Sequence, residues 1–192
     1  MKIITTPNPI LITKSKPVKK FDRKLKNIII DMEKTLIATV DPVGVGLAAP
    51  QVGLSFRLFL TKPSDQSPTS IYINPVIKHE SKDEAVLKFS NSKKIEANKP
   101  KSSKKKLLEG CLSLPNIWGN VSRKKELTLA WQDEDGTFHT KHFKGFPAVI
   151  IQHEMDHLNG ILFTKHVMEQ KEQLYRSHKN KKGEDVFDEI EI

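Results

Sequence analysis

Apolar and polar residues alternate with two different periods along this 192-residue chain, and the periods separate predicted helices from predicted strands. Between residues 22 and 40 the apolar positions recur every three or four residues, which predicts an amphipathic helix. Its apolar face consists of Leu25, Ile28, Ile29, Met32 and Leu36. A second helix is predicted to begin at Phe146-Pro147, where proline fits the first turn, and to end at Asn159-Gly160.

Short segments rich in aromatic and β-branched residues predict strands ahead of this second helix. Residues 56–60 and 71–75 form one such pair, on either side of a Pro/Ser-rich connection. Residues 127–131 and 137–140 form another pair and flank Asp135-Gly136, which is typical of a β-hairpin. Because the strands precede the long helix and do not alternate with helices, we expect an α+β fold.

Polar segments indicate where the chain leaves its core. Residues 79–106 are mostly Lys, Ser, Asn and Glu, so we expect an inserted loop there. A polar helix is predicted for residues 166–178. The final nine residues carry five acids and no base, so residues 179–192 are expected to be a frayed tail. No internal repeat or domain boundary is evident, and residues 1–178 are therefore expected to form one catalytic domain.

The net charge of +9 is not by itself evidence of a nucleic-acid-binding protein, because most of it comes from one segment. Residues 91–106 alone hold seven Lys and one Glu, and only four of the 32 basic residues are Arg. With few aromatic residues beside the lysines, we expect no recognition of a specific nucleic-acid sequence. Weak attraction to a polyanion such as the ribosome stays open.

Three absences bear on location. The N-terminus lacks the long apolar run of a signal peptide, and no segment is apolar enough to span a bilayer. The single cysteine, Cys111, cannot form an internal disulfide, which favours a reducing compartment. We therefore expect a cytoplasmic protein without a membrane partner.

The segment His153-Glu154-Met155-Asp156-His157 carries the clearest chemistry. Two histidines four residues apart lie on one side of a helix, where both imidazoles can bind one metal ion. Glu154 is placed to act as a base on a water beside that ion. The apolar residues that precede the pair predict a buried helix, and a metal ion is the natural partner for two buried histidines.

A catalytic metal site needs a third protein ligand and an open position. A third histidine ten positions after the first would indicate a metzincin protease, but position 163 is Phe. Glu172 is a candidate of the kind used by thermolysin-like proteases. Cys111 is another, because Gly110 and the short apolar stretch after it predict a tight turn that presents the sulfur. Spacing alone leaves Cys111 and Glu172 as alternatives.

Residues 44–53 form a Gly-rich stretch that contains Gln51. It lacks the Lys-Ser/Thr of a phosphate-binding loop and the third Gly of a dinucleotide fingerprint. Such a stretch can bring backbone close to a ligand and place the Gln51 amide in a site.

Together, the three segments resemble the signature motifs of the peptide deformylase family, in that family's order. The motifs are Gly-x-Gly-Leu-Ala-Ala-Pro-Gln, Glu-Gly-Cys-Leu-Ser and Gln-His-Glu-x-Asp-His-Leu-Asn-Gly, which this chain matches at residues 44–51, 109–113 and 152–160. The resemblance implies antiparallel β-sheets around a central helix that carries the His-Glu pattern. It also implies Cys111, His153 and His157 as metal ligands, with water in the fourth position and Fe²⁺ as the native ion. Zn²⁺, Ni²⁺ or Co²⁺ would be tolerated.

The same resemblance implies removal of the formyl group from the N-terminal methionine of new polypeptides. Glu154 would be the general base, while the Gln51 amide and the Leu112 N–H would stabilise the oxyanion. Gly46 and Gly110 would contact the substrate. The basic segment 165–182 would correspond to extensions that make transient ribosome contact. In place of a basic residue that many members carry after Pro115, this chain has Asn116-Ile117-Trp118-Gly119-Asn120.

Two other functions compete with this interpretation. A zincin-type metallopeptidase would use His153, Glu154, His157 and Glu172, but it would not need the segments around Gln51 and Cys111. A catalytically silent ribosome-associated protein would explain the basic charge, but every residue that the deformylase mechanism requires is present.

Overall fold

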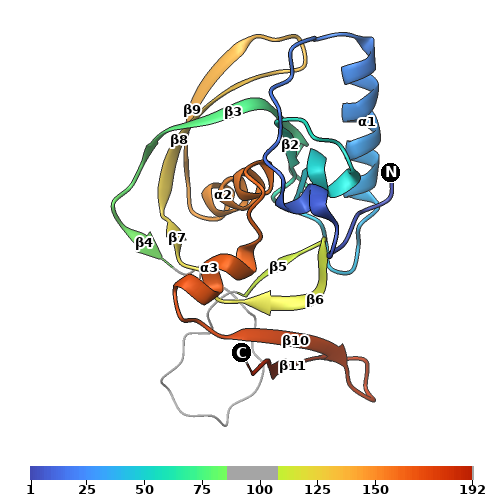
Figure 1. Cartoon of the computed structure of the whole chain (residues 1–192), viewed down its shortest axis with the longest axis vertical. Helices are drawn as coiled ribbons and strands as arrows, with labels where there is room; N and C mark the ends of the chain where they lie inside the picture. Colours follow the sequence, from blue (N-terminus) through green and yellow to red (C-terminus); the bar gives the residue numbers. More distant parts are fainter. Residues whose placement is uncertain (86–107, 192) are drawn as a thin grey trace.

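A computed structural model describes residues 1–85 and 108–191 of the chain (Figure 1). Its helices are α1 (Arg23–Ile37), α2 (Phe146–Leu158) and α3 (Phe163–Glu169). Of two short 3-10 turns, η1 (Pro9–Ile12) precedes α1 and η2 (Ala49–Val52) follows β1 (Gly46–Ala48). Helix α1 lies in the segment predicted from periodicity and ends three residues earlier than expected, and α2 lies between the predicted proline start and Asn-Gly stop. None of the described helices is long and apolar enough to cross a bilayer.

All strands within the sheets pair antiparallel. The five-stranded sheet has the order β1 (Gly46–Ala48), β2 (Leu58–Thr61), β3 (Ser70–Glu80), β8 (Glu126–Gln132) and β9 (Phe138–Lys144). The four-stranded sheet has the order β11 (Asp185–Glu189), β10 (Leu174–Lys179), β6 (Leu114–Gly119) and β5 (Glu109–Cys111). Strands β4 (Glu84–Ala85) and β7 (Arg123–Lys124) form a small third sheet. The predicted α+β class is confirmed.

The five-stranded sheet has apolar contacts on both of its faces. The apolar side of α1 packs on one face, where Leu25, Ile29, Met32 and Leu36 join Leu47, Leu58, Leu60 and Ile73 in a buried cluster. Helix α2 covers the other face, where Ala148, Ile151, Met155 and Leu158 pack with Phe59, Tyr72, Leu127 and Leu129. Burial of the apolar residues of α2 against the sheet fixes the position of this helix. Figure 1 shows α2 between the five-stranded sheet and strands β5 and β6.

The C-terminal segment differs from the sequence expectation. The polar helix predicted for residues 166–178 is wrong beyond Glu169, and the tail predicted for residues 179–192 contains a strand. Strands β10 and β11 form a hairpin that pairs with β6. Two of the five acids counted in the tail contact bases across this hairpin, Asp185 with Lys179 at 2.8 Å and Asp188 with His178 at 3.1 Å.

The predicted inserted loop is shorter at its start than expected, because residues 79–80 belong to β3 and residues 84–85 to β4. Residues 86–107, with all seven lysines counted above, lie outside the described residues.

Candidate active site

Cys111, His153 and His157 form a compact group of potential metal ligands. Cys111 ends β5, and the two histidines lie one turn apart on α2. One ligand atom from each residue lies within 4.8 Å of the others, and the Cys111 Sγ is 3.2 Å from the His157 Nε2. A thiolate with two imidazoles is a donor set that suits a divalent transition metal, and three protein donors leave a position open for water or substrate.

The surroundings of Cys111 favour its role as a metal ligand. A register shift between Gly110 and Cys111 turns the strand, and the Ser113 N–H donates to the Sγ at 3.4 Å. Burial alone would raise the pKa of the Cys111 thiol, but the neighbouring His157 and His153 outweigh it and lower the pKa to about 5. The side chain is therefore a thiolate at neutral pH, the form that binds metals.

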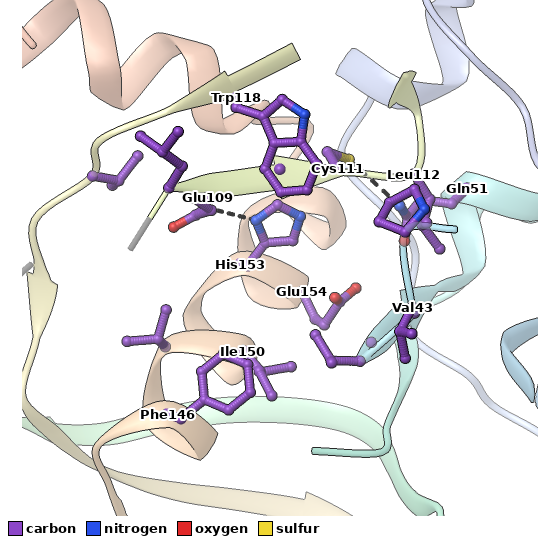
Figure 2. A pocket seen from close by; sticks show the side chains of 18 residues that line it. Val43, Gln51, Glu109, Cys111, Leu112, Trp118, Phe146, Ile150, His153 and Glu154 are labelled. Carbon is purple, nitrogen blue, oxygen red and sulfur yellow. Dashed lines mark hydrogen bonds and ion pairs between the residues drawn. The ribbon is translucent and has the colours of Figure 1, made fainter. Parts of the chain in front are cut away.

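Glu109 orients the second ligand. Its Oε1 lies 2.6 Å from the His153 Nδ1, so the His153 Nδ1–H donates to the carboxylate and leaves the Nε2 free for a metal (Figure 2). Burial would raise the pKa of Glu109, but the charge of Arg123 and the bond to His153 lower it to about 2. Glu109 is thus an anion that fixes the tautomer of His153.

Arg123 holds this anion in place from β7. Its Nε donates to the Glu109 Oε2 at 3.1 Å, and its Nη1 donates to the Asp156 Oδ2 at 2.6 Å. Asp156 also contacts the His166 Nε2 at 2.9 Å. The Arg123 side chain is only 5% exposed, so these charges are paired away from water. No role was predicted from the sequence for Arg123, Glu109 or Asp156, although Glu109 and Asp156 lie inside the matched motifs.

Arg123→Met should lower both stability and metal affinity, because Glu109 and Asp156 would stay buried without their counter-charge. Breaking a buried pair costs about 3–5 kcal/mol, and loss of an outer-shell partner costs about 10–100-fold in metal affinity. Urea unfolding and chelator competition measure the two effects. Lys26→Met is the matched control, since it breaks only the exposed pair with Asp135 and should change neither quantity appreciably. Unchanged metal affinity in Arg123→Met would contradict the orienting role.

Glu154 lies between the potential ligands and the backbone of β1. It is 3% exposed, and its Oε2 has no hydrogen-bond partner among the described residues. Burial raises the pKa of Glu154 to about 7, against the lowering effect of His153 and His157. A Cβ at Gly46 would lie 2.8 Å from the Glu154 Cδ, so glycine is required for this close approach. The carboxyl group is therefore placed to exchange a proton near neutral pH.

Gln51 presents its amide nitrogen to the same space. The Ala48 N–H donates to the Gln51 Oε1 at 2.8 Å, which fixes the orientation of the amide. The Gln51 Nε2 then donates toward the Cys111 Sγ at 3.6 Å. The residue is 1% exposed, so its orientation is set by these two contacts.

A pocket connects these groups (Figure 2). Seven of the eight site residues expected from the sequence line it, namely Gly46, Gln51, Gly110, Cys111, Leu112, His153 and Glu154. His157, the eighth, belongs to the ligand group. One side of the pocket is apolar and includes Phe146, Val149 and Ile150 from the first turns of α2. Glu172 follows α3 and is not a member of the ligand group.

Comparisons with known proteins identify the family of this chain. Residues 1–173 match the family model for polypeptide deformylase. The chain is 38% identical over 181 residues to the peptide deformylase of Campylobacter jejuni, covering 94% of each chain. It is 35% identical over 185 residues to that of Borreliella burgdorferi, covering 95% of this chain and 98% of the other.

Solved structures give the same result. The peptide deformylase from Thermotoga maritima is similar with a TM-score of 0.71 and 33% identity, covering 86% of this chain and 95% of that one. A Plasmodium falciparum peptide deformylase is similar with a TM-score of 0.69 and 34% identity, covering 88% and 90%. The chain therefore belongs to the peptide deformylase family.

Proposed function

We propose that this chain removes the formyl group from the N-terminal methionine of new polypeptides, and that Cys111, His153 and His157 hold the metal ion required. The observation that supports this most strongly is the Cys-His-His group at a pocket lined by two of its members, Cys111 and His153, and by the buried Glu154. A divalent ion held there would supply Lewis acidity, polarising a carbonyl and making a water more acidic. Thiolate and imidazole donors suit Fe²⁺, which we propose as the native ion, and also Zn²⁺, Ni²⁺ or Co²⁺.

Glu154 would move the proton. Its Oε2 has no hydrogen-bond partner in the described part of the chain, so it can accept a proton from the attacking water and then donate it to the leaving amine of methionine. The buried position excludes bulk water from this transfer.

Gln51 and Leu112 would stabilise the negative charge that develops on the formyl oxygen. The Gln51 Nε2 is oriented in advance by the Ala48 N–H, and Leu112 follows Cys111 directly, so its backbone N–H lies beside the ligand group. Fixed donors of this kind are worth about 3–4 kcal/mol each in the transition state. The backbone of Gly46 and Gly110 would contact the formyl-methionine, and the methionine side chain would enter the apolar side formed by Phe146, Val149 and Ile150.

Gly46→Ala should lower kcat by about tenfold or more, because the new methyl group would displace the Glu154 carboxyl from its position. Steady-state kinetics with a formyl-Met peptide measure the loss. The double variant with Glu154→Gln is the control. If Gly46→Ala acts through Glu154, adding it to Glu154→Gln should cost little more, whereas independent losses would multiply and refute the explanation.

Turnover of formyl-Met-Ala by the metal-replete protein, compared with an unformylated peptide of several residues, tests the proposed function. Release of formate without internal cleavage is expected. Internal cleavage without formate release would overturn the proposal in favour of a peptidase.

We also propose formylated nascent chains as the substrate in a cytoplasmic setting, with transient contact to the ribosome through basic segments.

Deleting residues 91–104 removes Lys93, Lys94, Lys99, Lys101 and Lys104 and should leave turnover of a small formyl-peptide intact. Ribosome binding should weaken and depend less steeply on salt, because fewer phosphates are neutralised. Cosedimentation with ribosomes at low and moderate salt measures this. Unchanged affinity would remove the docking proposal.

A further inference from the structure

Trp118 forms a part of the pocket wall to which no role has been assigned. Figure 2 shows it across His153 from Phe146 and Ile150, so it lies away from the apolar side proposed for methionine. Its ring packs on the backbone of Gly110, where an added Cβ would be 2.6 Å from the Trp118 Cε3. Gly110 directly precedes Cys111. The indole is therefore beside the ligand group and open to the pocket.

The C-terminal hairpin holds this indole in place. The Trp118 Nε1–H donates to the Ser177 Oγ at 2.9 Å, and the Phe187 ring meets the indole edge-on with centroids 5.9 Å apart. Tyr175 is opposite Trp118 and Ser177 is opposite Phe187 in the strand register, so all four side chains lie on one face of the sheet. The polypeptide deformylase family model matches only residues 1–173, so the hairpin lies beyond the matched part.

Phe187 extends the aromatic surface outward from the pocket. It is 41% exposed although it is a large apolar side chain. Glu189 is two residues further along the same strand and therefore on the same face, with an exposed carboxylate. Lys179 lies on this face as well and is exposed beside Asp185, so the aromatic surface that begins at Trp118 is bordered by charged groups of both signs.

We propose that Trp118 contacts the substrate residue that follows formyl-methionine, and that the hairpin, through Ser177 and Phe187, positions Trp118 so that an apolar side chain is preferred there. The inference rests on the proposed function. With the formyl carbon near Glu154 and the methionine side chain against Phe146, the peptide must leave the pocket along another wall. Trp118 is the aromatic residue on that wall, and its apolar ring favours an apolar side chain over an ionised one.

A purely structural role is the competing explanation, in which Trp118 only attaches the hairpin to the sheet. The two explanations differ in what a substitution changes. A structural defect would slow every substrate alike, whereas loss of a contact would raise KM only for substrates that have a residue to make it.

The test compares four amidated substrates with the metal-loaded full chain, namely formyl-Met-Phe, formyl-Met-Gly, formyl-Met-Asp and formyl-Met without a second residue. We expect kcat/KM in the order Phe, Gly, Asp. The Phe-to-Gly ratio is the kcat/KM for formyl-Met-Phe divided by that for formyl-Met-Gly. Trp118→Ala should lower this ratio by about tenfold, mainly through KM, and Trp118→Phe should keep most of the preference. Ser177→Ala, the milder change, should lower the ratio by about threefold. Formyl-Met-amide should be affected little by any of these changes.

Arg176→Ala is the matched control, because Arg176 is exposed on the same strand and faces the opposite side. It should leave all four rates unchanged. A binding measurement is independent of turnover. The chain has two tryptophans, so in a Trp131→Phe background the indole fluorescence comes from Trp118 alone. Titration with the product Met-Phe-amide should change this fluorescence at lower concentration than Met-Gly-amide does.

Three results would overturn the inference. One is an unchanged Phe-to-Gly ratio in Ser177→Ala and in Trp118→Ala. Another is an equal loss for all substrates, formyl-Met-amide included, which indicates a structural role. A third is equal fluorescence titrations by the two products. If the wild-type chain released formate from none of the four, the proposed function itself would fail and this inference with it.

Discussion

Glu154→Gln should keep the fold and the metal but lower kcat for a formyl-Met peptide by ~10²-fold or more, the range typical of a lost general base. The substituted amide is nearly the same size as the carboxyl group, so the buried space beside Gly46 stays filled. What is lost is the atom that accepts and returns the proton. Steady-state kinetics, metal analysis and thermal unfolding together measure the three parts of this expectation.

Glu84→Gln serves as the control, because it changes a carboxyl to an amide at an exposed position where Glu84 contacts Lys124. It should leave kcat unchanged. A Glu154→Gln protein with near-normal turnover would refute the assignment of Glu154 as the base. A protein that also lost its metal would show instead that the carboxyl group helps to retain the ion.

Replacement of Cys111, His153 or His157 by Ala should abolish both metal retention and activity. Each residue would provide one of three protein bonds to the ion, and the group contains no fourth donor among the described residues. Metal content after gel filtration and turnover after reloading with excess Fe²⁺ or Co²⁺ are the two measurements.

His142→Ala is the control for histidine loss in general, since His142 on β9 is exposed and contacts Glu126 on β8. It should retain metal and activity. If Cys111→Ala kept a full complement of metal while Glu172→Ala lost it, the ligand set would be that of a zincin, and the assignment of Cys111 as the third ligand would be wrong.

Local pattern was sufficient to predict much of this structure. Helix α1 follows from the 3.6-residue period of its apolar positions, and α2 follows from its proline start and Asn159-Gly160 stop. The β8–β9 hairpin follows from Asp135-Gly136 between two strand-forming segments. The pair His153 and His157 was predicted because i and i+4 positions share a side of a helix. These features depend on neighbours in sequence, which is why the sequence reveals them.

The C-terminal hairpin could not be predicted in the same way. Its strands are stable because β10 pairs with β6, a contact between residues more than 50 positions apart. The acids near the end of the chain indicated a frayed tail. Composition does not show that in the hairpin Lys179 lies opposite Asp185 and His178 lies opposite Val186. Tertiary pairing decided the outcome over local propensity.

The third metal ligand and the charged residues that hold the ligands in place could not be predicted from local pattern either. Spacing left Cys111 and Glu172 as alternatives, and only the resemblance to a family chose between them. The fold brings Cys111 to α2 across a strand bend, and it buries Arg123 between Glu109 and Asp156. No periodicity relates these positions, so their cooperation becomes visible only in three dimensions.

X-ray absorption at the metal edge of the Co²⁺-loaded or Fe²⁺-loaded protein tests the proposed metal centre most directly. We expect one sulfur scatterer at about 2.3 Å and two imidazole nitrogens at about 2.0–2.1 Å, with Cys111→Ser removing the sulfur signal. A first shell of nitrogen and oxygen without sulfur would contradict Cys111 as a ligand, and with it the metal centre on which the proposed mechanism depends.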